Sequence, residues 1–288
     1  PTNRFAINLP PTVQFLRGTS VPVAIFPDGR SLVFNGAGDG GNQIYARSLE
    51  ELDPVPVRGA EGSFGSLFLS PDGEWIGFND TTDNTFKRVR ATGGPPVTIS
   101  ETGLSGVGYR GASWGIAGVI AFSTTAEPSL MVVPEVGGIP EPLTEPAEGE
   151  EHAFPHFLPD GHSLLFEVNR TGEERQIAVL DADSGEIRIL IEGSGPKFVP
   201  SGHVLFAREN AVWAVAFDLD RLELLGDAVP VLERVRMSLG RAQFTVSADG
   251  TLVYVANSGQ EGTQVVWVDR DGREELIPGI PPGRYLEV

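Results

Sequence analysis

Short apolar stretches alternate with polar residues along the whole chain, and one turn sequence recurs between them. IFPDGRSLVF, LSPDGEWIGF, FLPDGHSLLF and VSADGTLVYV each place an Asp-Gly pair between two apolar runs. The centre of this turn recurs at intervals of 44, 45, 43, 41 and 48 residues, at Asp28, Asp72, Ala117, Asp160, Ser201 and Asp249. A near-constant period of this length predicts a repeat architecture.

Each repeat contains four stretches with the period-2 alternation that is typical of β-strands. One strand leads into the turn and a second leaves it. A third follows a variable polar loop, and a fourth follows a hairpin rich in Gly, Asp or Pro. The 36 glycines and 23 prolines suit a fold with many tight turns. Four strands per repeat are the blade of a β-propeller, in which neighbouring blades cover each other's faces. We therefore predict an all-β protein, a six-bladed β-propeller of four-stranded antiparallel blades.

The boundaries of the repeats predict a single propeller domain over residues 1–288, and residues 280–288 start a further strand or a linker. Residues 4–10 form a lone strand before the first repeat. A seven-bladed propeller is the alternative, with this strand at the outer edge of a blade completed outside these residues. The chain begins with Pro1 and has no signal peptide, so we expect a mature or excised fragment. The six repeats are expected at approximately 21–60, 61–104, 105–148, 149–193, 194–237 and 238–279.

The repeated aspartate is predicted to shape the turn rather than to do chemistry. In Pro-Asp-Gly, Pro presets the backbone, Asp accepts hydrogen bonds from nearby amides, and Gly supplies a positive φ. Two repeats carry Ala117 and Ser201 where the others have Asp. A catalytic or metal-binding role repeated around a ring does not fit this loss.

The turn F-x-P-D-G-x-x-L-x-F and the strand that follows it resemble the TolB-type, WD40-like propeller repeat. More narrowly, FAINLPP, GSFGSLFLSPDGEWIGF, TGGPPVTI, RGASWG and HFLPDGHSLLF together resemble the extracellular propeller of bacterial transmembrane serine/threonine kinases. This resemblance implies a non-catalytic sensor or interaction domain in the periplasm or at the cell surface. No kinase motif is present, so no kinase activity is assigned to any residue. The alternative is the substrate-gating propeller of a prolyl-oligopeptidase-type serine peptidase, which carries related blades.

Charge narrows the set of partners. The net charge is −18 and the isoelectric point about 4.6, so the chain repels phosphate backbones and we expect no nucleic-acid binding. We expect contact with a membrane only through parts outside these residues. The expected partner is a protein or peptide, or a small ligand at the mouth of the channel. The chain has no cysteine, which excludes disulfides, thiolate metal sites and cysteine nucleophiles.

Several motifs that suggest catalysis are better explained by structure, and we expect this fragment not to be an enzyme. GASWG around Ser113 matches the nucleophile elbow G-x-S-x-G, but it lies on a predicted innermost strand with no helix after it. His152 and His156 would share a face of one strand, about 13 Å apart at 3.3 Å per residue, too far for one zinc ion. No cofactor is expected, and structural calcium at the acidic residues 145–151 is the alternative.

The position of residues relative to the turn of each repeat predicts a binding surface. In a propeller the loop that enters each innermost strand borders the central channel on one face. Aromatic and Arg residues are what binding surfaces use. Eight residues before each turn centre the repeats place Ser20, Phe64, Tyr109, His152, Gly193 and Arg241, and Arg110 adjoins Tyr109. We predict a channel-rim binding site that consists of Phe64, Tyr109, Arg110, His152 and Arg241.

Overall fold

The computed structural model describes most of the chain, and every element in the described part is a strand or an isolated bridge. The described residues are 6–16, 22–62, 65–80, 83, 85–101, 109–238, 240–257, 266–268, 274–276 and 285–287. Within these ranges no helix has the length and apolar character needed to cross a membrane.

The strands form consecutive antiparallel sheets, each built from one continuous stretch of chain except the last. The first sheet contains β2 (Gln14–Phe15), β3 (Val23–Ile25), β4 (Ser31–Gly38), β5 (Gly41–Ser48) and β6 (Val55–Glu61). The second contains β7 (Phe68–Leu69), β8 (Trp75–Asp80), β9 (Thr85–Arg90) and β10 (Val97–Glu101). The third contains β11 (Tyr109–Trp114), β12 (Val119–Thr124), β13 (Met131–Pro134) and β14 (Glu141–Pro142).

The next two sheets follow the same plan, and the last sheet combines strands from both ends of the chain. The fourth contains β15 (Glu150–Phe157), β16 (Leu164–Arg170), β17 (Gln176–Leu180) and β18 (Ile187–Glu192). The fifth contains β19 (Ser194–Val199), β20 (His203–Arg208), β21 (Ala211–Asp218) and β22 (Glu223–Leu232). The last contains β25 (Phe244–Val246), β26 (Leu252–Tyr254), β29 (Tyr285–Glu287) and β1 (Ala6–Asn8).

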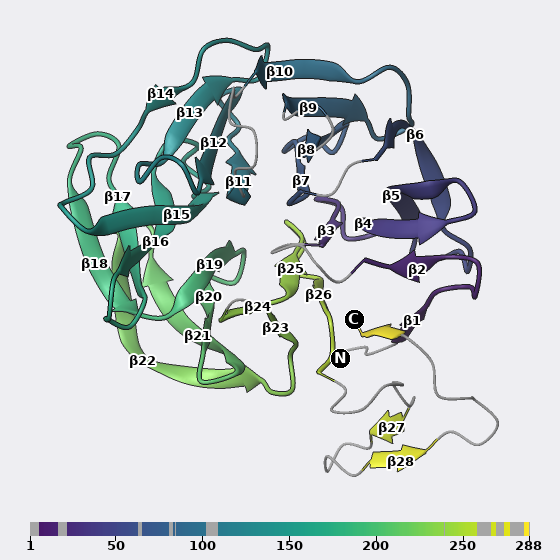
Figure 1. The fold of residues 1–288 in the computed structure, drawn as a ribbon. Coiled ribbons are helices and arrows are strands. Elements are labelled where there is room, and N and C mark those ends of the chain that lie inside the picture. Colours follow the sequence, from purple (N-terminus) through teal and green to yellow (C-terminus); the bar gives the residue numbers. More distant parts are fainter. Residues whose placement is uncertain are drawn as a thin grey trace.

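These sheets follow one another around a common centre, which is the arrangement of a propeller (Figure 1). The innermost strands β3, β7, β11, β15, β19 and β25 face the centre, and successive innermost strands contact one another over much of the ring. The all-β propeller fold predicted from the repeat is therefore confirmed.

The end of the chain differs from the repeat. The period assigns the stretches around β27 (Val266–Val268) and β28 (Glu274–Leu276) to the third and fourth strands of the last blade, but these two strands pair only with each other. β29 pairs with β26 instead, and β1 pairs with β29 as the outermost strand. The predicted start of a further innermost strand at residues 280–288 thus lies in the last sheet. Because of this exchange the number of blades stays a prediction.

The turn that defines the repeat has the predicted geometry. All six turn glycines have a positive φ, from 69° at Gly29 to 92° at Gly250. The carboxylate of Asp72 accepts a hydrogen bond from the Glu74 amide at 2.9 Å, and that of Asp160 accepts one from His162 at 3.0 Å. These bonds confirm that the aspartate shapes its own turn.

The hydrophobic core lies between neighbouring sheets. Five second strands bury a phenylalanine five or six positions after the turn centre, and these residues are Phe34, Phe78, Phe122, Phe166 and Phe206. The buried Val255 takes the equivalent position directly after β26. Each fully buried Phe contributes roughly 1.5–3 kcal/mol. The repeated burial holds the sheets face to face and so fixes the innermost strands around the channel.

Candidate functional site

A pocket lies at the centre of the ring, where the innermost strands begin. It is a shallow pocket with a cavity volume of about 40 Å³, and it opens to solvent. Its lining comes from segments of neighbouring sheets and includes Leu67, Ala112, Phe154, Lys197, Arg241 and Phe244. Most of these residues lie four to eight positions before a turn centre. The pocket therefore coincides with the face of the channel where the sequence predicts a rim.

A repeated backbone irregularity shapes this pocket. β11, β15 and β19 each contain a β-bulge near their first residues, opposite β12, β16 and β20. Each bulge contains one residue with a positive φ six positions before the turn centre: Gly111 at 93°, Phe154 at 52° and Gly195 at 60°. A bulge bends its strand and redirects the side chains that follow it. Ser113, His156 and Lys197, two residues further on, are the equivalent side chains after each bulge.

Phe154 is the exception among the three bulges because it is not glycine. A bulky residue in the left-handed region costs about 1–3 kcal/mol and persists only where its surroundings hold it there. The guanidinium carbon of Arg241 lies 4.0 Å from the centre of the Phe154 ring, which is a cation–π contact. A Cβ at Gly111 would come within 2.9 Å of the same ring, so Gly111 leaves room for it.

A buried ion pair ties β24 (Arg241–Ala242) to β16 across the sheet between them. Nε of Arg241 donates to Oε2 of Glu167 at 3.0 Å, and a second guanidinium nitrogen bonds Oε1. Glu167 is 0% exposed and also accepts a hydrogen bond from the Gly195 amide at 3.1 Å, while Arg175 lies 3.5 Å away. Burial lowers the pKa of Arg241, and the carboxylate of Glu167 opposes that shift. Arg241 is therefore a paired cation at the wall of the pocket.

Lys197 is the cation of this pocket without such a partner. Its half-buried side chain makes no hydrogen bond or ion pair with the described residues, and burial lowers its pKa to about 8. The neighbouring His156 has a pKa lowered to about 3, by burial and by the positive charge of Lys197. At neutral pH the pair therefore consists of an ammonium and a neutral imidazole.

The residues of the predicted channel-rim site lie in different surroundings. Arg241 lines the pocket, and Arg110 is half-buried in an ion pair with Glu151. Phe64 lies outside the described residues, and so does the side chain of Tyr109, although its backbone belongs to β11. The binding role of the set stays a prediction.

His152 is 2% exposed and supports the sheet from inside. Its Nδ1 lies 2.8 Å from the Thr144 hydroxyl, and its Nε2 lies 2.7 Å from a carboxylate oxygen of Glu150. The prediction that His152 and His156 share one face is wrong, because the bulge between Ala153 and His156 lies between them. Among the described residues, no three His, Asp or Glu side chains gather as a metal site would need.

Ser113 connects two innermost strands. It lies within β11, its hydroxyl accepts a hydrogen bond from the Phe157 amide at 3.0 Å, and the next element is β12 rather than a helix. Ser113 therefore does not occupy the strand-to-helix turn of a nucleophile elbow.

Sequence reasoning missed Lys197 and Phe154. One signal for Lys197 was present: the chain has 21 basic residues, and Lys87 and Lys197 are its only lysines. Lys87 forms ion pairs with Asp80 at 2.8 Å and with Asp83 at 2.5 Å, which leaves Lys197 as the unusual one. The bulge at Phe154 had no signal because no glycine marks it.

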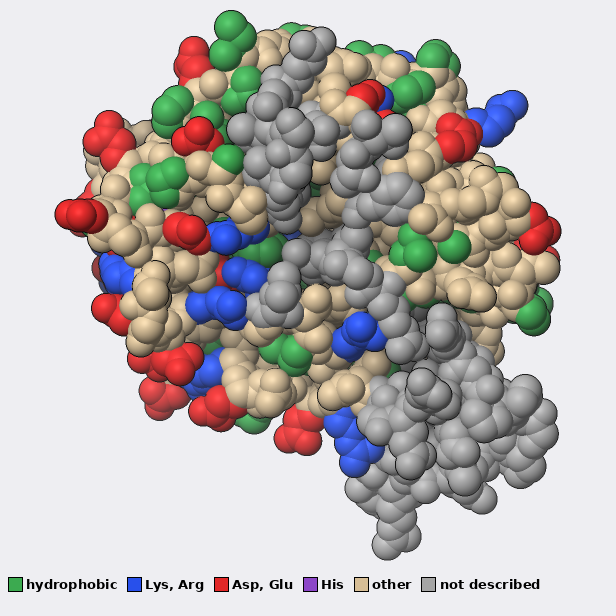
Figure 2. All heavy atoms as spheres, in the orientation of Figure 1, with side chains coloured by type: hydrophobic (Ala, Val, Ile, Leu, Met, Phe, Trp, Pro, Cys, Tyr) green, Lys and Arg blue, Asp and Glu red, His purple; other side chains and the backbone are tan. Residues whose placement is uncertain are grey.

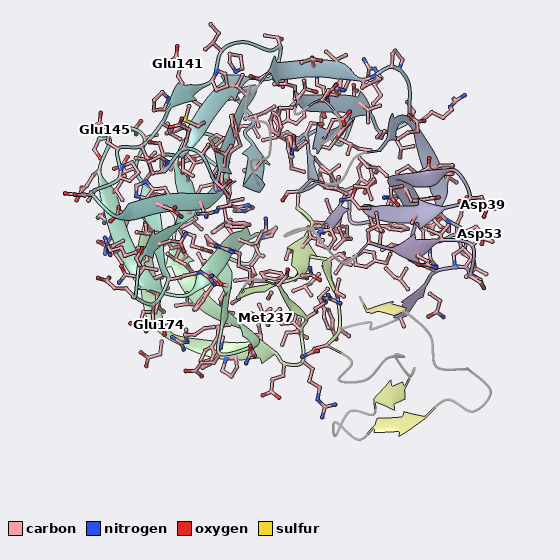
Figure 3. The ribbon with its side chains drawn as sticks, in the orientation of Figure 1. Asp39, Asp53, Glu141, Glu145, Glu174 and Met237 are labelled. Carbon is pink, nitrogen blue, oxygen red and sulfur yellow. The ribbon has the colours of Figure 1, made fainter. Side chains whose placement is uncertain are left out.

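Charge is distributed unevenly over the molecule. Lys and Arg side chains gather toward the centre of the face in Figure 2, over the region of β15, β19 and β20. The labelled acidic residues in Figure 3 lie at the outer edge of the ring, among them Asp39, Asp53 and Glu174. Around the pocket, Arg241 and Arg175 share the carboxylate of Glu167, and Lys197 lines the pocket as a further cation. A cleft with an excess of one sign attracts ligands of the other.

No protein-family model and no curated protein sequence matches the chain. Solved structures do match it. A TolB protein from Agrobacterium tumefaciens is 20% identical over 81% of this chain and 87% of its own, with a TM-score of 0.57. A streptogramin B lyase is 13% identical over 88% of this chain and 95% of its own, with a TM-score of 0.60. A chain of a nidogen/laminin complex is 15% identical over 85% of this chain and 91% of its own, with a TM-score of 0.58. At these identities the comparisons show a TolB-like β-propeller fold.

One expectation needs correction. The absence of a recognisable catalytic motif led to the expectation that this fragment is not an enzyme. The streptogramin B lyase has the same fold over most of both chains. A propeller of this kind can be catalytic, so the fold and the missing motif do not exclude an enzyme.

Proposed function

We propose that this chain is a ligand-binding propeller that takes part of a protein or peptide partner into the mouth of its central channel. The observation that carries this proposal is the pocket where the innermost strands begin. Its lining contains a strained Phe154 and Lys197, which has no ion-pair partner among the described residues. Strained residues and groups with shifted pKa values cluster at functional sites. The nidogen/laminin complex supports the proposal because it contains a propeller of this fold in a protein assembly.

The cellular setting in this proposal comes from sequence resemblance. The repeats resemble the extracellular propeller of bacterial transmembrane serine/threonine kinases, and the fold is that of TolB. We place the chain on the extracytoplasmic side of a membrane, in the periplasm or at the cell surface, as the sensor domain of a larger receptor kinase. In that role, occupation of the channel mouth by a partner is the signal.

Selection of peptides by the purified chain tests the proposal. Random peptides displayed with free ends are enriched on the chain, and their affinities are measured by fluorescence anisotropy. Ala242→Phe narrows the pocket, and Ala182→Phe adds the same ring to an exposed hairpin between β17 and β18. We expect Ala242→Phe to abolish binding and Ala182→Phe to preserve it. Mass spectrometry of the recovered peptides shows whether they leave the chain intact or altered.

Two results would count against the proposal. One is a set of peptides that bind both variants equally well, which would place the binding surface elsewhere. The other is that no peptide is enriched although both proteins are folded, as equally cooperative unfolding of Ala242→Phe and the original chain would show.

A further inference from the structure

Lys197 differs from the other cations of the pocket because nothing in the described part of the chain neutralises it. Arg241 is bonded twice to Glu167, and Arg175 lies against the same carboxylate. Arg110 is paired with Glu151. A half-buried ammonium without a counter-charge is unfavourable for the folded chain. Its presence in the pocket calls for a partner that comes from outside.

The surroundings of Lys197 fit a single negative charge. His156 on β15 is the titratable group that faces it, and this imidazole is neutral at physiological pH. Arg241 on β24 and Arg175 share the one carboxylate of Glu167 on β16, so these three groups together carry one positive charge. The described lining from β11, β25 and residues 66–67 contributes no titratable side chain. One ammonium beside a neutral ring matches a monoanion better than a phosphate dianion.

The remaining lining is apolar. Leu67, Phe154, Pro155 and Phe244 provide aromatic and aliphatic surface within the same pocket. Ligand pockets commonly combine such surface with a few polar groups that fix orientation. A ligand that suits both the ammonium and the apolar lining carries a carboxylate next to an apolar group. The C-terminal residue of a peptide does so when its side chain is apolar.

We propose that Lys197 is the anion subsite of the channel mouth, and that its ammonium binds the carboxylate of a ligand whose adjoining group is apolar. The inference rests on the proposed function because it names the ligand chemistry for the same pocket. Two sources share this chemistry: a free organic acid and the C-terminus of a polypeptide. The lowered pKa adds a testable property, since the ammonium is lost as the pH rises through about 8.

The presence of only two lysines allows a test on the unmodified chain. Trace labelling with acetic anhydride, read by mass spectrometry, reports the accessibility of Lys197 and Lys87 separately. The probes are N-acetyl-phenylalanine, its uncharged primary amide and inorganic phosphate. We expect N-acetyl-phenylalanine to slow labelling at Lys197 and to leave Lys87 unchanged, while the amide and phosphate protect neither. Equal protection by acid and amide, or protection by phosphate alone, would overturn the proposal.

Calorimetric titration with the same acid and amide adds a test by substitution. Lys197→Gln removes the charge, and Lys87→Gln removes the other lysine as a control. A charge-assisted bond of ordinary strength predicts that Lys197→Gln weakens binding of the acid by roughly 10- to 100-fold and leaves the amide unchanged. Lys197→Arg should restore binding of the acid and keep it above pH 8, where the original chain loses it. Unchanged affinity of Lys197→Gln for the acid contradicts the proposal.

A hexapeptide that ends in phenylalanine, with a free or an amidated C-terminus, separates the two sources. Tighter binding of the free-ended peptide than of N-acetyl-phenylalanine assigns the carboxylate to a chain terminus, and the reverse order assigns it to a free acid. The inference can fail alone: if Ala242→Phe abolishes binding of the selected peptides but Lys197→Gln does not weaken them, the pocket is the site and its anion subsite is not Lys197.

Discussion

Each innermost strand begins at the channel mouth and ends at the turn of its repeat. The residues at these two ends differ in how strictly they repeat from sheet to sheet. At the turn end, every repeat has a left-handed glycine, and aspartates such as Asp72 and Asp160 bond their own turn amides. At the channel mouth, three equivalent positions carry Ser113, His156 and Lys197, which have nothing chemical in common. The backbone bulge at the mouth recurs, but its side chains do not.

This difference shows how the molecule separates stability from recognition. The turn end must close the same hairpin in every repeat, so local backbone chemistry decides its residues. At the mouth, the bulge fixes only the bend of each innermost strand. The side chains after the bulge are therefore free to vary between sheets. The strained Phe154 and the buried charges around Glu167 lie there. The predictions below test this contrast from the largest expected effect to the smallest.

Glu167→Gln is expected to have the largest effect on stability. The substitution keeps the shape but leaves the buried guanidinium of Arg241 without its carboxylate, and breaking a buried pair costs about 3–5 kcal/mol. Urea unfolding measures the loss. Glu74→Gln is the control, since its pair with Arg90 is exposed and should cost less than about 1 kcal/mol. Similar losses at both sites would mean that the mouth holds no special electrostatic structure.

Lys197 predicts a pH dependence of stability at high pH. Its pKa in the folded chain, about 8, lies below the ordinary 10.5, so the unfolded chain binds more protons between these values. Stability therefore rises with pH across this window, by up to about 2 kcal/mol after allowance for partial exposure. Chemical unfolding at pH 7.5, 9 and 10 measures the slope. The free energy of unfolding of Lys197→Met should change less with pH than that of the original chain. An identical slope in both would show that Lys197 has an ordinary pKa.

Gly202→Ala tests the turn end. The φ of Gly202 is 74°, and no heavy atom lies within 4 Å of an added Cβ, so backbone strain alone should cost about 1–2 kcal/mol. Gly40→Ala is the matched control because an added Cβ there also meets nothing, while its φ is not positive. Thermal unfolding compares the two. Equal stability of both variants would contradict the left-handed turn.

Asp72→Asn should have the smallest effect. The Ser70 hydroxyl and the Glu74 amide hold the pKa of Asp72 below its ordinary value. The carboxylate therefore stabilises the fold above its unfolded pKa, and this contribution is lost as the pH falls through the folded pKa. Because Asp72 is exposed, the loss at pH 7 should be less than about 1 kcal/mol. Acid unfolding curves should start at a lower pH for the original chain than for the variant, and a reversed order would contradict the assignment.

The sequence predicted the turn end well because its physics is local. The roles of Asp28, Asp72 and the glycines after them can be predicted from the short turn sequence that contains them. The last sheet was predicted less well, because β26 is completed by β29 and β1 rather than by β27. Period-2 alternation identifies a strand but not its partner, and several strands here are candidates for the same edge.

The site could be predicted only by position. Arg241 was found from its distance to the turn, yet the same rule selected His152, which is buried beside Thr144. The backbone was a second obstacle, because the bulge at Phe154 has no glycine that would mark it in the sequence. Lys197 becomes notable only when its lack of a partner in the described structure is set against the paired Lys87.

Cross-linking of a selected peptide tests the central claim, that ligands bind where the innermost strands begin, most directly. A benzophenone on the peptide forms covalent adducts with the chain, and mass spectrometry locates them. The account predicts adducts within β11, β15 and β19 and at residues 241–244, lost when an excess of unlabelled peptide competes. Adducts concentrated on outer strands such as β10 or β22 would contradict it.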